Sequence, residues 1–441
     1  MLSHRAQRLL AVVAVAMVLL VPWAARPSTA ASSHAVLKAS ILGAWFGPEK
    51  TNLLAVLSYC RTHYNVNATY QQFMGNAEAN LNARVRAGNP PDLATFSTLS
   101  PIKPYVLEGS VHPLTFLDTP TFRKQYASFW RNLGTINGKL YAIYMKADVK
   151  SIIWYSVRKF RSGHYTIPRT WSQIVALSQK MVKDGKHPWA FGAGGTTSSP
   201  WTLADFFDNV YLMVAGPTKY DRLVDHTISW TDPSVKKTFQ VMNQIVGDSA
   251  MIAGGRTRAL SQDFAAAATQ MVTDPEADFF AEATFVGALL RTTLPRDLEG
   301  KDYSAFAFPR IGNWPVTPVT VGPNGVEMFK DTPGSRALTK CLVDPNALAQ
   351  WAKLGGFISP NNATPPSAYP DALTRAITQL MIKAGKAGLL RVGADDLMPA
   401  GVGASPSGCM PVQLTKWFSN PTSYAARTRA LESCARKVYG H

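Results

Sequence analysis

Long apolar segments are almost missing from this sequence of 441 residues. The run Leu9–Val21 follows two basic residues, Arg5 and Arg8, and precedes the small residues Ser28-Thr29-Ala30. This order is typical of a secretory signal peptide, and the run is too short to span a bilayer. No later stretch has the roughly 18 uninterrupted apolar residues of a membrane helix. We therefore predict a signal peptide over residues 1–30, an exported mature chain and, without a nearby cysteine, no lipid anchor.

Cysteine is scarce as well. The four cysteines are Cys60, Cys341, Cys409 and Cys434, and they form no CxxC pair and no cluster with histidine. A zinc site is therefore not expected, and we predict no bound metal. In an exported chain an even number of cysteines permits disulfides. Of three possible connectivities we favour Cys409–Cys434 for its proximity, which leaves Cys60–Cys341; four buried thiols are the alternative.

The sequence also lacks the common catalytic motifs. It has no HExxH helix, no GxSxG elbow, no Walker loop and no GxGxxG after a strand. The glycine-rich segment at 192–195 has no lysine of the kind that a phosphate-binding loop requires. A glycosidase would need two facing carboxylates, and nothing marks such a pair among the 28 acidic residues. We predict a protein that is not an enzyme and uses no cofactor.

Acidic residues are outnumbered by basic ones. The chain has 45 Lys and Arg against 28 Asp and Glu, which gives a formal charge of +17. The basic residues are scattered and form no basic–aromatic module of the kind found in nucleic-acid-binding proteins. We therefore expect no nucleic acid partner, and a solvated basic surface suited to an acidic cell envelope.

Strands and helices alternate at the start of the mature chain. We predict strands at 36–44, 66–70 and 92–96 and helices at 51–63 and 77–87. This order favours a parallel sheet with helices on its faces. Ligands of such sheets bind beyond the carboxyl ends of the strands, which here are residues 45–49 and 96–98.

Further strands are predicted along the chain, and the middle is mainly helical. The predicted strands cover 139–144, after the turn residues Asn137-Gly138, then 151–155, 303–308 and 319–328. Ser199-Pro200 is a strong helix start, and we expect this helix to run to about Ala215 and to stop at Gly216.

A series of motifs resembles one protein family. PDLATF (91–96), NGKLYAIY (137–144), SIIWYS (151–156), TWSQI (170–174), FPRIG (308–312) and FKDTPGSRAL (329–338) occur in this order. Together they resemble the extracellular sugar-binding receptors of ABC transporters, the family that includes maltose-binding protein. PWAFG (188–192), SSPW (198–201), GPTKYDRL (216–223), GGFISPN (355–361) and DDLMP (395–399) resemble its alpha-glucoside-binding members. Leu203-Ala204-Asp205-Phe206 departs from the Thr-Asp-Trp of those relatives, so the sugar stays open.

The resemblance implies an α/β fold of the periplasmic-binding-protein type II class, with two lobes, a hinge and an interlobe cleft. By motif, the first lobe comprises 36–144 plus 319–345, and the second comprises 146–318 plus 346–441. It further implies a periplasmic or extracellular monomer that binds a sugar and delivers it to the membrane permease subunits of an ABC importer. Two alternatives are the same fold with an anionic or other polar solute, and a secreted carbohydrate hydrolase.

A sugar needs flat rings for its C–H faces and paired acceptors and donors for its hydroxyls, because an unmatched buried group costs about 1–3 kcal/mol. This requirement, loop position and the resemblance select the candidate ligand-binding residues Trp45, Glu49, Phe96, Ser97, Trp201, Asp205, Phe285, Asp395 and Asp396. Trp201 is the strongest candidate, since it begins a helix after a Gly/Ser loop. For the others, core packing or a solvated surface is the alternative.

Overall fold

The computed structural model describes residues 35–73, 77–96, 102–194, 200–403 and 407–440. From Val36 onward these residues form one compact unit. The predicted signal peptide over 1–30 and the predicted helix cap Ser199 lie outside the described residues. Ser97 lies outside them too.

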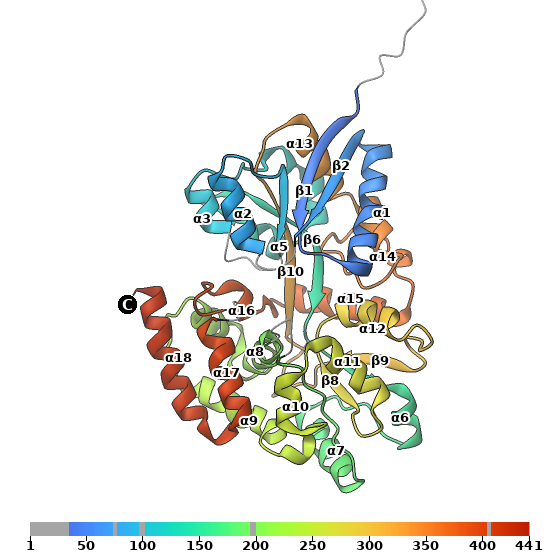
Figure 1. Cartoon of the computed structure of the whole chain (residues 1–441), viewed down its shortest axis with the longest axis vertical. Coiled ribbons are helices and arrows are strands. Elements are labelled where there is room, and N and C mark those ends of the chain that lie inside the picture. Colours follow the sequence, from blue (N-terminus) through green and yellow to red (C-terminus); the bar gives the residue numbers. More distant parts are fainter. Residues whose placement is uncertain (1–34, 74–76, 97–101, 195–199, 404–406, 441) are drawn as a thin grey trace, which may run out of the picture. The chain divides into compact units, whose positions relative to one another are not determined.

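A six-stranded mixed sheet occupies the upper part of Figure 1. Its strands are β1 (Leu37–Gly43), β2 (Val66–Gln72), β3 (Leu93–Phe96), β6 (Ala142–Val149), β10 (Val319–Met328) and β11 (Leu390–Val392). β1 pairs in parallel with β2 and β3, as the strand–helix alternation predicted. β10 makes the sheet mixed, because it runs antiparallel to both β3 and β6 and parallel to β11.

Helices cover this sheet. They are α1 (Gly47–His63), α2 (Ala77–Arg86), α3 (Ile102–Leu107), α4 (Pro120–Gln125), α5 (Ser128–Leu133), α13 (Pro333–Cys341) and α14 (Pro345–Ala352). α1 begins four residues before the predicted start, because Pro48 suits the first turn of a helix. α14 packs against α1 (Figure 1).

The segment predicted as one strand at 139–144 is divided. Lys139–Leu140 forms β5, which pairs with β4 (Thr135–Ile136) across the Asn137-Gly138 turn. The next strand, β6, begins at Ala142 and changes partner to β10. All residues of β6 and β10 are buried, and their pairing shifts register between Asn324 and Gly325.

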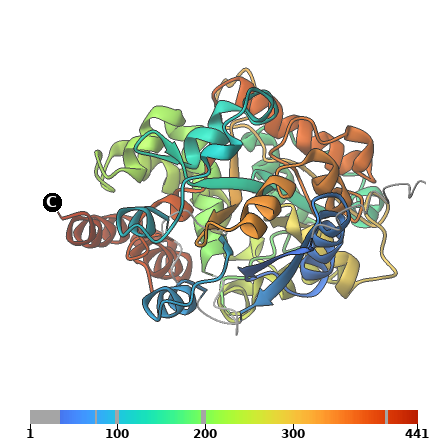
Figure 2. The same cartoon turned by 90° about the horizontal axis from the view of Figure 1, so that it is seen from above.

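A second sheet lies lower in Figure 1 and is antiparallel, in the order β8 (Phe279–Ala281), β7 (Ile152–Ser156), β9 (Tyr303–Ala307). The helices of this part of the chain are α6 (Val157–Ser162), α7 (Trp171–Lys183), α8 (Trp201–Val224), α9 (Pro233–Val246), α10 (Gly255–Ser261), α11 (Phe264–Thr273) and α12 (Phe285–Thr293). The chain closes with α15 (Ala372–Lys386), α16 (Ala394–Leu397), α17 (Cys409–Ser419) and α18 (Tyr424–Tyr439). α17 and α18 pack together at the edge near the C-terminus (Figure 2).

The helix that begins α8 ends where it was predicted to end. Gly216 takes a non-helical conformation with a positive φ (77°), and a second helical segment, which is counted with α8, begins directly at Pro217. Glycine adopts this conformation without steric cost, and proline suits a first helical position. The second half of α8 is fastened to β11: Tyr220 Oη donates to the Val392 carbonyl at 2.9 Å, and Arg391 pairs with Asp221 at 2.6 Å.

Two large apolar cores hold the unit together. The first underlies the six-stranded sheet and includes the fully buried Trp351, and the second surrounds α8 and includes Trp189 and Trp230. Trp417 and Phe418 are fully buried in the second core, as packing residues would be.

Two disulfides are present. They join Cys60 in α1 to Cys341 in α13, and Cys409 in α17 to Cys434 in α18. These are the two pairs that the sequence analysis favoured. No helix among the described residues has both the length and the apolar character needed to cross a membrane.

Candidate ligand-binding site

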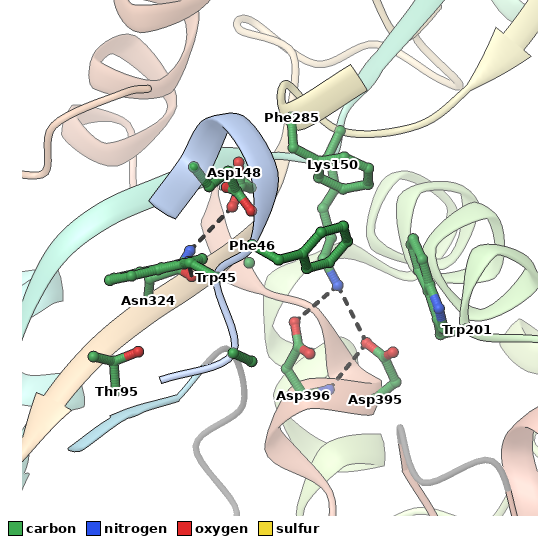
Figure 3. Close-up of a pocket in the computed structure, with 14 residues that line it drawn as sticks. Trp45, Phe46, Thr95, Asp148, Lys150, Trp201, Phe285, Asn324, Asp395 and Asp396 are labelled. Atoms are coloured by element: carbon green, nitrogen blue, oxygen red, sulfur yellow. Dashed lines mark hydrogen bonds and ion pairs between the residues drawn. The ribbon is translucent and has the colours of Figure 1, made fainter. Parts of the chain in front are cut away.

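A pocket of about 410 Å³ lies where the carboxyl end of β1, the β6–β10 pair, the start of α8 and the segment after β11 meet (Figure 3). This volume is in the range of small-molecule sites. The residues that line it are Ala44, Trp45, Phe46, Glu49, Thr95, Asp148, Lys150, Trp201, Ala283, Phe285, Gly322, Asn324, Asp395 and Asp396.

Four aromatic rings border the pocket. Trp45 and Phe46 come from the loop between β1 and α1, and Trp201 and Phe285 begin α8 and α12. The rings of Trp201 and Phe285 lie 6.0 Å apart and both pack against Phe264, so their positions are fixed. Phe46 has 61% of its surface exposed, which is unusual for a phenylalanine and leaves its face free for a ligand.

Trp45 is held from two sides. Its Nε1 donates a hydrogen bond to Asn324 Oδ1 at 3.3 Å, and its ring meets Trp351 edge-on at 5.1 Å. Asn324 in turn donates through Nδ2 to Asp148 Oδ2 at 3.0 Å. The indole is therefore positioned by residues of β10, β6 and α14 before any ligand arrives.

One buried lysine neutralises the acids at the α1 side of the pocket. Lys146 Nζ lies 2.6 Å from Asp148 Oδ2 and 3.0 Å from Glu49 Oε1. Burial alone lowers the pKa of a lysine, but the two carboxylates outweigh it and raise the pKa of Lys146, so the ammonium stays charged.

A second buried lysine, Lys150, forms the floor of the pocket together with the acids around it. Lys150 Nζ lies 2.8 Å from Asp396 Oδ2 and 3.5 Å from Asp395 Oδ1 (Figure 3). It also lies 2.5 Å from Asp205 Oδ1. Burial opposes the charged form of Lys150, yet these three acids raise its pKa well above the ordinary value. Gly393 leaves room for the cluster, because a Cβ at this position would lie 2.8 Å from Lys150 Nζ and 2.7 Å from Asp395 Oδ1.

More carboxyl groups lie behind the floor. Burial raises the pKa of Asp205, Asp208 and Asp396 well above its usual value, and it raises the pKa of Glu282 to about 8. Oxygens of Asp205, Asp208 and Asp395 lie within 4.8 Å of one another, and these are the residues that could hold a cation. The other acids of the site have partners of their own. Glu49 and Asp148 pair with Lys146, Asp396 pairs with Lys150, and Glu282 accepts a hydrogen bond from the Ala283 amide.

Most of the predicted site residues come together at this pocket. Trp45, Glu49, Trp201, Phe285, Asp395 and Asp396 all line it. Asp205 lies behind the floor, where it pairs with Lys150 instead of facing the pocket. Phe96 does not line the pocket: it is buried in a small apolar cluster with Tyr105 and Phe329, and its neighbour Thr95 faces the pocket instead. Successive strand residues point to opposite faces, which explains the difference of one residue.

The pocket also has lining residues that were not predicted from the sequence, among them Phe46, Thr95, Asp148, Lys150, Gly322 and Asn324. The sequence does contain a signal for two of these residues, Asp148 and Lys150. Asp148 and Lys150 stand in the segment MKADVK between two apolar strands, where ionised side chains are costly to bury unless they are paired. Charges in such a place therefore indicate a site.

The arrangement suits a ligand with apolar C–H faces and several hydroxyls. Rings on two sides supply flat contact surfaces, and the carboxylate and amide oxygens of Asp148, Asp395, Asp396 and Asn324 can accept hydrogen bonds. Each unmatched hydroxyl in such a site costs about 1–3 kcal/mol, so an arrangement of this kind favours a ligand whose hydroxyls match its acceptors.

Comparison with known proteins places the chain in a family. Residues 60–376 match the bacterial extracellular solute-binding proteins. The chain belongs to this family. This solute-binding protein is 30% identical over 366 residues to the osmoprotective compounds-binding protein GgtB of Synechocystis sp., a match that covers 82% of this chain and 85% of GgtB. It is 26% identical to the alpha-glucosides-binding periplasmic protein AglE of Rhizobium meliloti, over 83% and 80% of the two chains.

Solved structures of the same class share the fold of this solute-binding protein. The bacterial solute receptor AcbH superposes with a TM-score of 0.77 at 18% identity, over 92% of this chain and 100% of AcbH. The raffinose complex of the solute-binding protein RafE gives a TM-score of 0.71 at 12% identity, over 91% and 100%. The predicted two-lobed α/β binding-protein fold is thereby confirmed.

Proposed function

We propose that this protein is the substrate receptor of an ABC importer and that it captures a small sugar, an alpha-glucoside or a related short glycoside, in the pocket. The observation that carries the proposal is the pocket itself: rings of Trp45, Trp201 and Phe285 face the same space as the carboxylates of Asp148, Asp395 and Asp396. A hexose ring needs this combination of flat apolar contact and hydrogen-bond acceptors.

The names of similar proteins agree with this ligand class. AglE is an alpha-glucosides-binding protein, and a third relative, GlcS of Saccharolobus solfataricus, is a glucose-binding protein that matches 38% of this chain at 21% identity. An anionic ligand is disfavoured, although the chain has a formal charge of +17, because Glu49, Asp148, Asp395 and Asp396 line the pocket against the single lysine Lys150.

Further parts of the proposal follow from the receptor role. Residues 1–30 direct export to the periplasm or beyond, and the protein acts as a monomer that releases its sugar to the permease subunits without chemical change. The lobes comprise 36–144 plus 319–345 and 146–318 plus 346–441, and they close on the ligand by a hinge motion. The β6–β10 pair, which is buried along its whole length, supports a hinge in that region.

Titration calorimetry with a panel of glucose, maltose, trehalose, sucrose and related glycosides tests the proposal. We expect saturable one-to-one binding of at least one sugar. Trp201→Ala should weaken that binding by more than about 1 kcal/mol, because a stacking ring is lost, whereas Trp201→Phe should keep most of it. Phe116→Ala is the matched control: Phe116 is a half-buried ring on a different groove, and its loss should leave the affinity unchanged.

Two outcomes would contradict the proposal. The first is the absence of binding heat with every sugar at millimolar concentration, and the second is an unchanged dissociation constant for Trp201→Ala. Incubation with aryl and alkyl glucosides should release no reducing ends, and steady release would identify the protein as a hydrolase instead.

A further inference from the structure

Three buried aspartates at and behind the pocket floor share one cation, Lys150, which pairs with two of them. Asp205 and Asp208 lie on α8, and Asp395 lies on α16. One carboxylate oxygen of each lies within 4.8 Å of those of the other two. Their exposed fractions are 2%, 0% and 2%, so bulk water does not solvate these charges.

Several oxygens of this group have no hydrogen-bond partner. Asp205 Oδ2 and Asp208 Oδ1 are buried and unpartnered, whereas the other oxygen of each is used: Asp205 Oδ1 binds Lys150, and Asp208 Oδ2 accepts from the Ala394 amide at 2.6 Å. Glu282 comes from a separate segment after β8 and is fully buried beside Asp205, and its Oε1 has no partner either. Unpaired buried oxygens are costly, and a cation is what satisfies several of them at once.

The charges of this group also favour a bound cation. Among the described residues, Lys150 is the only cation with an ion pair to Asp205, Asp395 or Asp396, and Asp208 has no ion pair. If the four aspartates are ionised, the one lysine leaves an excess of three negative charges in a buried volume.

We propose that Asp205, Asp208 and Asp395 bind a calcium ion behind the floor of the pocket. The donor set consists of oxygens only, which suits hard cations. Calcium is favoured over magnesium, because magnesium loses its water shell reluctantly and this group is buried, whereas calcium accepts several carboxylates, mono- or bidentate, in a flexible geometry. The ion would join α8 to α16, whose ligands lie 190 positions apart in the chain, and would hold the segment that carries Asp396 beneath the ligand.

The test needs no sugar, so its result is independent of the proposed function. Full-length mature protein is purified without chelators, and its calcium is measured by mass spectrometry. It is then dialysed against EDTA, and its melting temperature is recorded with and without added CaCl2 or MgCl2. We expect about one calcium per chain, a melting temperature that falls after EDTA, and recovery with calcium at a concentration where magnesium has little effect, since an ion that binds only the folded state raises stability.

Variants make the assignment specific. Asp208→Asn should abolish the calcium response, and direct calorimetric titration of the EDTA-treated wild type with CaCl2 keeps the proposal falsifiable if this variant does not fold. Asp331→Asn is the control, because Asp331 pairs with Arg336 in an exposed place, and it should keep the full response. The proposal is overturned by a protein that contains no calcium and shows no calcium-dependent melting, by an equal response to magnesium, or by an unchanged calcium response in Asp208→Asn.

Discussion

Trp45 Nε1 donates a hydrogen bond to Asn324 Oδ1 at 3.3 Å, although 279 positions separate the two residues in the chain. The bond ties the loop after β1 to the middle of β10, at the point where the β6–β10 register shifts. Since Asn324 also donates to Asp148, one amide positions both a ring and a carboxylate of the pocket.

Asn324→Ala should therefore weaken sugar binding about tenfold. The substitution leaves the Trp45 indole N–H without its partner and removes one hydrogen bond from Asp148, which keeps its ion pair to Lys146; an unpaired group such as this N–H costs about 1–3 kcal/mol. Calorimetric titration with the best sugar of the panel measures the effect. Asn346→Ala, at an exposed position of α14, should bind like the wild type. An unaltered affinity in Asn324→Ala would show that this amide does not position Trp45.

Gly393→Ala should damage the floor of the pocket. The new methyl group would meet Lys150 Nζ, Asp395 Oδ1 and Asp396 Oδ2 at 3.0 Å or less, so the ion cluster must open. We expect a loss of about 1–3 kcal/mol in the free energy of unfolding, the usual range for overpacking, together with weaker ligand binding. Urea unfolding measures the first effect.

Gly385→Ala is the matched control for this substitution. Gly385 lies in α15, and a Cβ there would meet only Leu390 at 3.6 Å, an ordinary contact. Alanine favours helix over glycine by about 1 kcal/mol, so this variant should be as stable as the wild type or more stable. Equal losses in both variants would contradict the steric explanation.

The two disulfides should differ in their contributions to stability. Cys60–Cys341 closes a loop of 281 positions, and Cys409–Cys434 closes one of 25. In the chain-entropy model these loops correspond to about 5–6 and about 3–4 kcal/mol, respectively. Replacing Cys60 and Cys341 by alanine should therefore lower the melting temperature more than replacing the other pair, as scanning calorimetry would detect. The reverse order would show that native contacts outweigh loop entropy here.

Glu432 should make the protein sensitive to acid. Partial burial works against the charged form, but Arg436 at 2.7 Å, the Trp230 amide at 2.9 Å and His226 at 3.2 Å outweigh it and lower the pKa of Glu432 to about 2. A carboxylate with a lowered pKa in the folded state stabilises the protein above its unfolded pKa, near 4.5, and loses this contribution as the pH falls toward 2.

Glu432→Gln should consequently be less stable than the wild type by about 1.5–3 kcal/mol at pH 7, the range for hydrogen bonds to a charged group. The difference should shrink between pH 4.5 and pH 2.5. Urea unfolding at a series of pH values measures it. A constant difference across this range would mean that Glu432 acts through packing and not through its charge.

The sequence predicted several strands of the main sheet and some of the pocket residues, but not the buried charges at the floor of the pocket. β10 was predicted with its observed bounds, Val319–Met328, although Gly322-Pro323-Asn324-Gly325 interrupts its branched residues. Trp45 and Glu49 were found because they follow a predicted strand of a parallel sheet. Phe96 was chosen in place of Thr95 because the face to which a strand residue points depends on register, which the pattern of a four-residue strand does not fix.

Lys150 and Asp148 escaped prediction for a different reason. Lys150 is neutralised by acids from distant segments, Asp205 and Asp396. Asp148 is neutralised by Lys146, two positions before it in β6, and accepts a hydrogen bond from Asn324 in β10. Sequence separations of 55 and 246 positions link Lys150 to its acids. No local pattern encodes such pairs.

The link from Tyr220 and Asp221 to β11 has a mechanical consequence. Asp205 precedes the break at Gly216, and Asp396 follows β11 by four positions, so the two acids that grip Lys150 belong to segments fastened to each other at the far end of α8. The second half of α8 and β11 should therefore move together, and Gly216 is the point at which the first half, with Asp205, can change its angle to them.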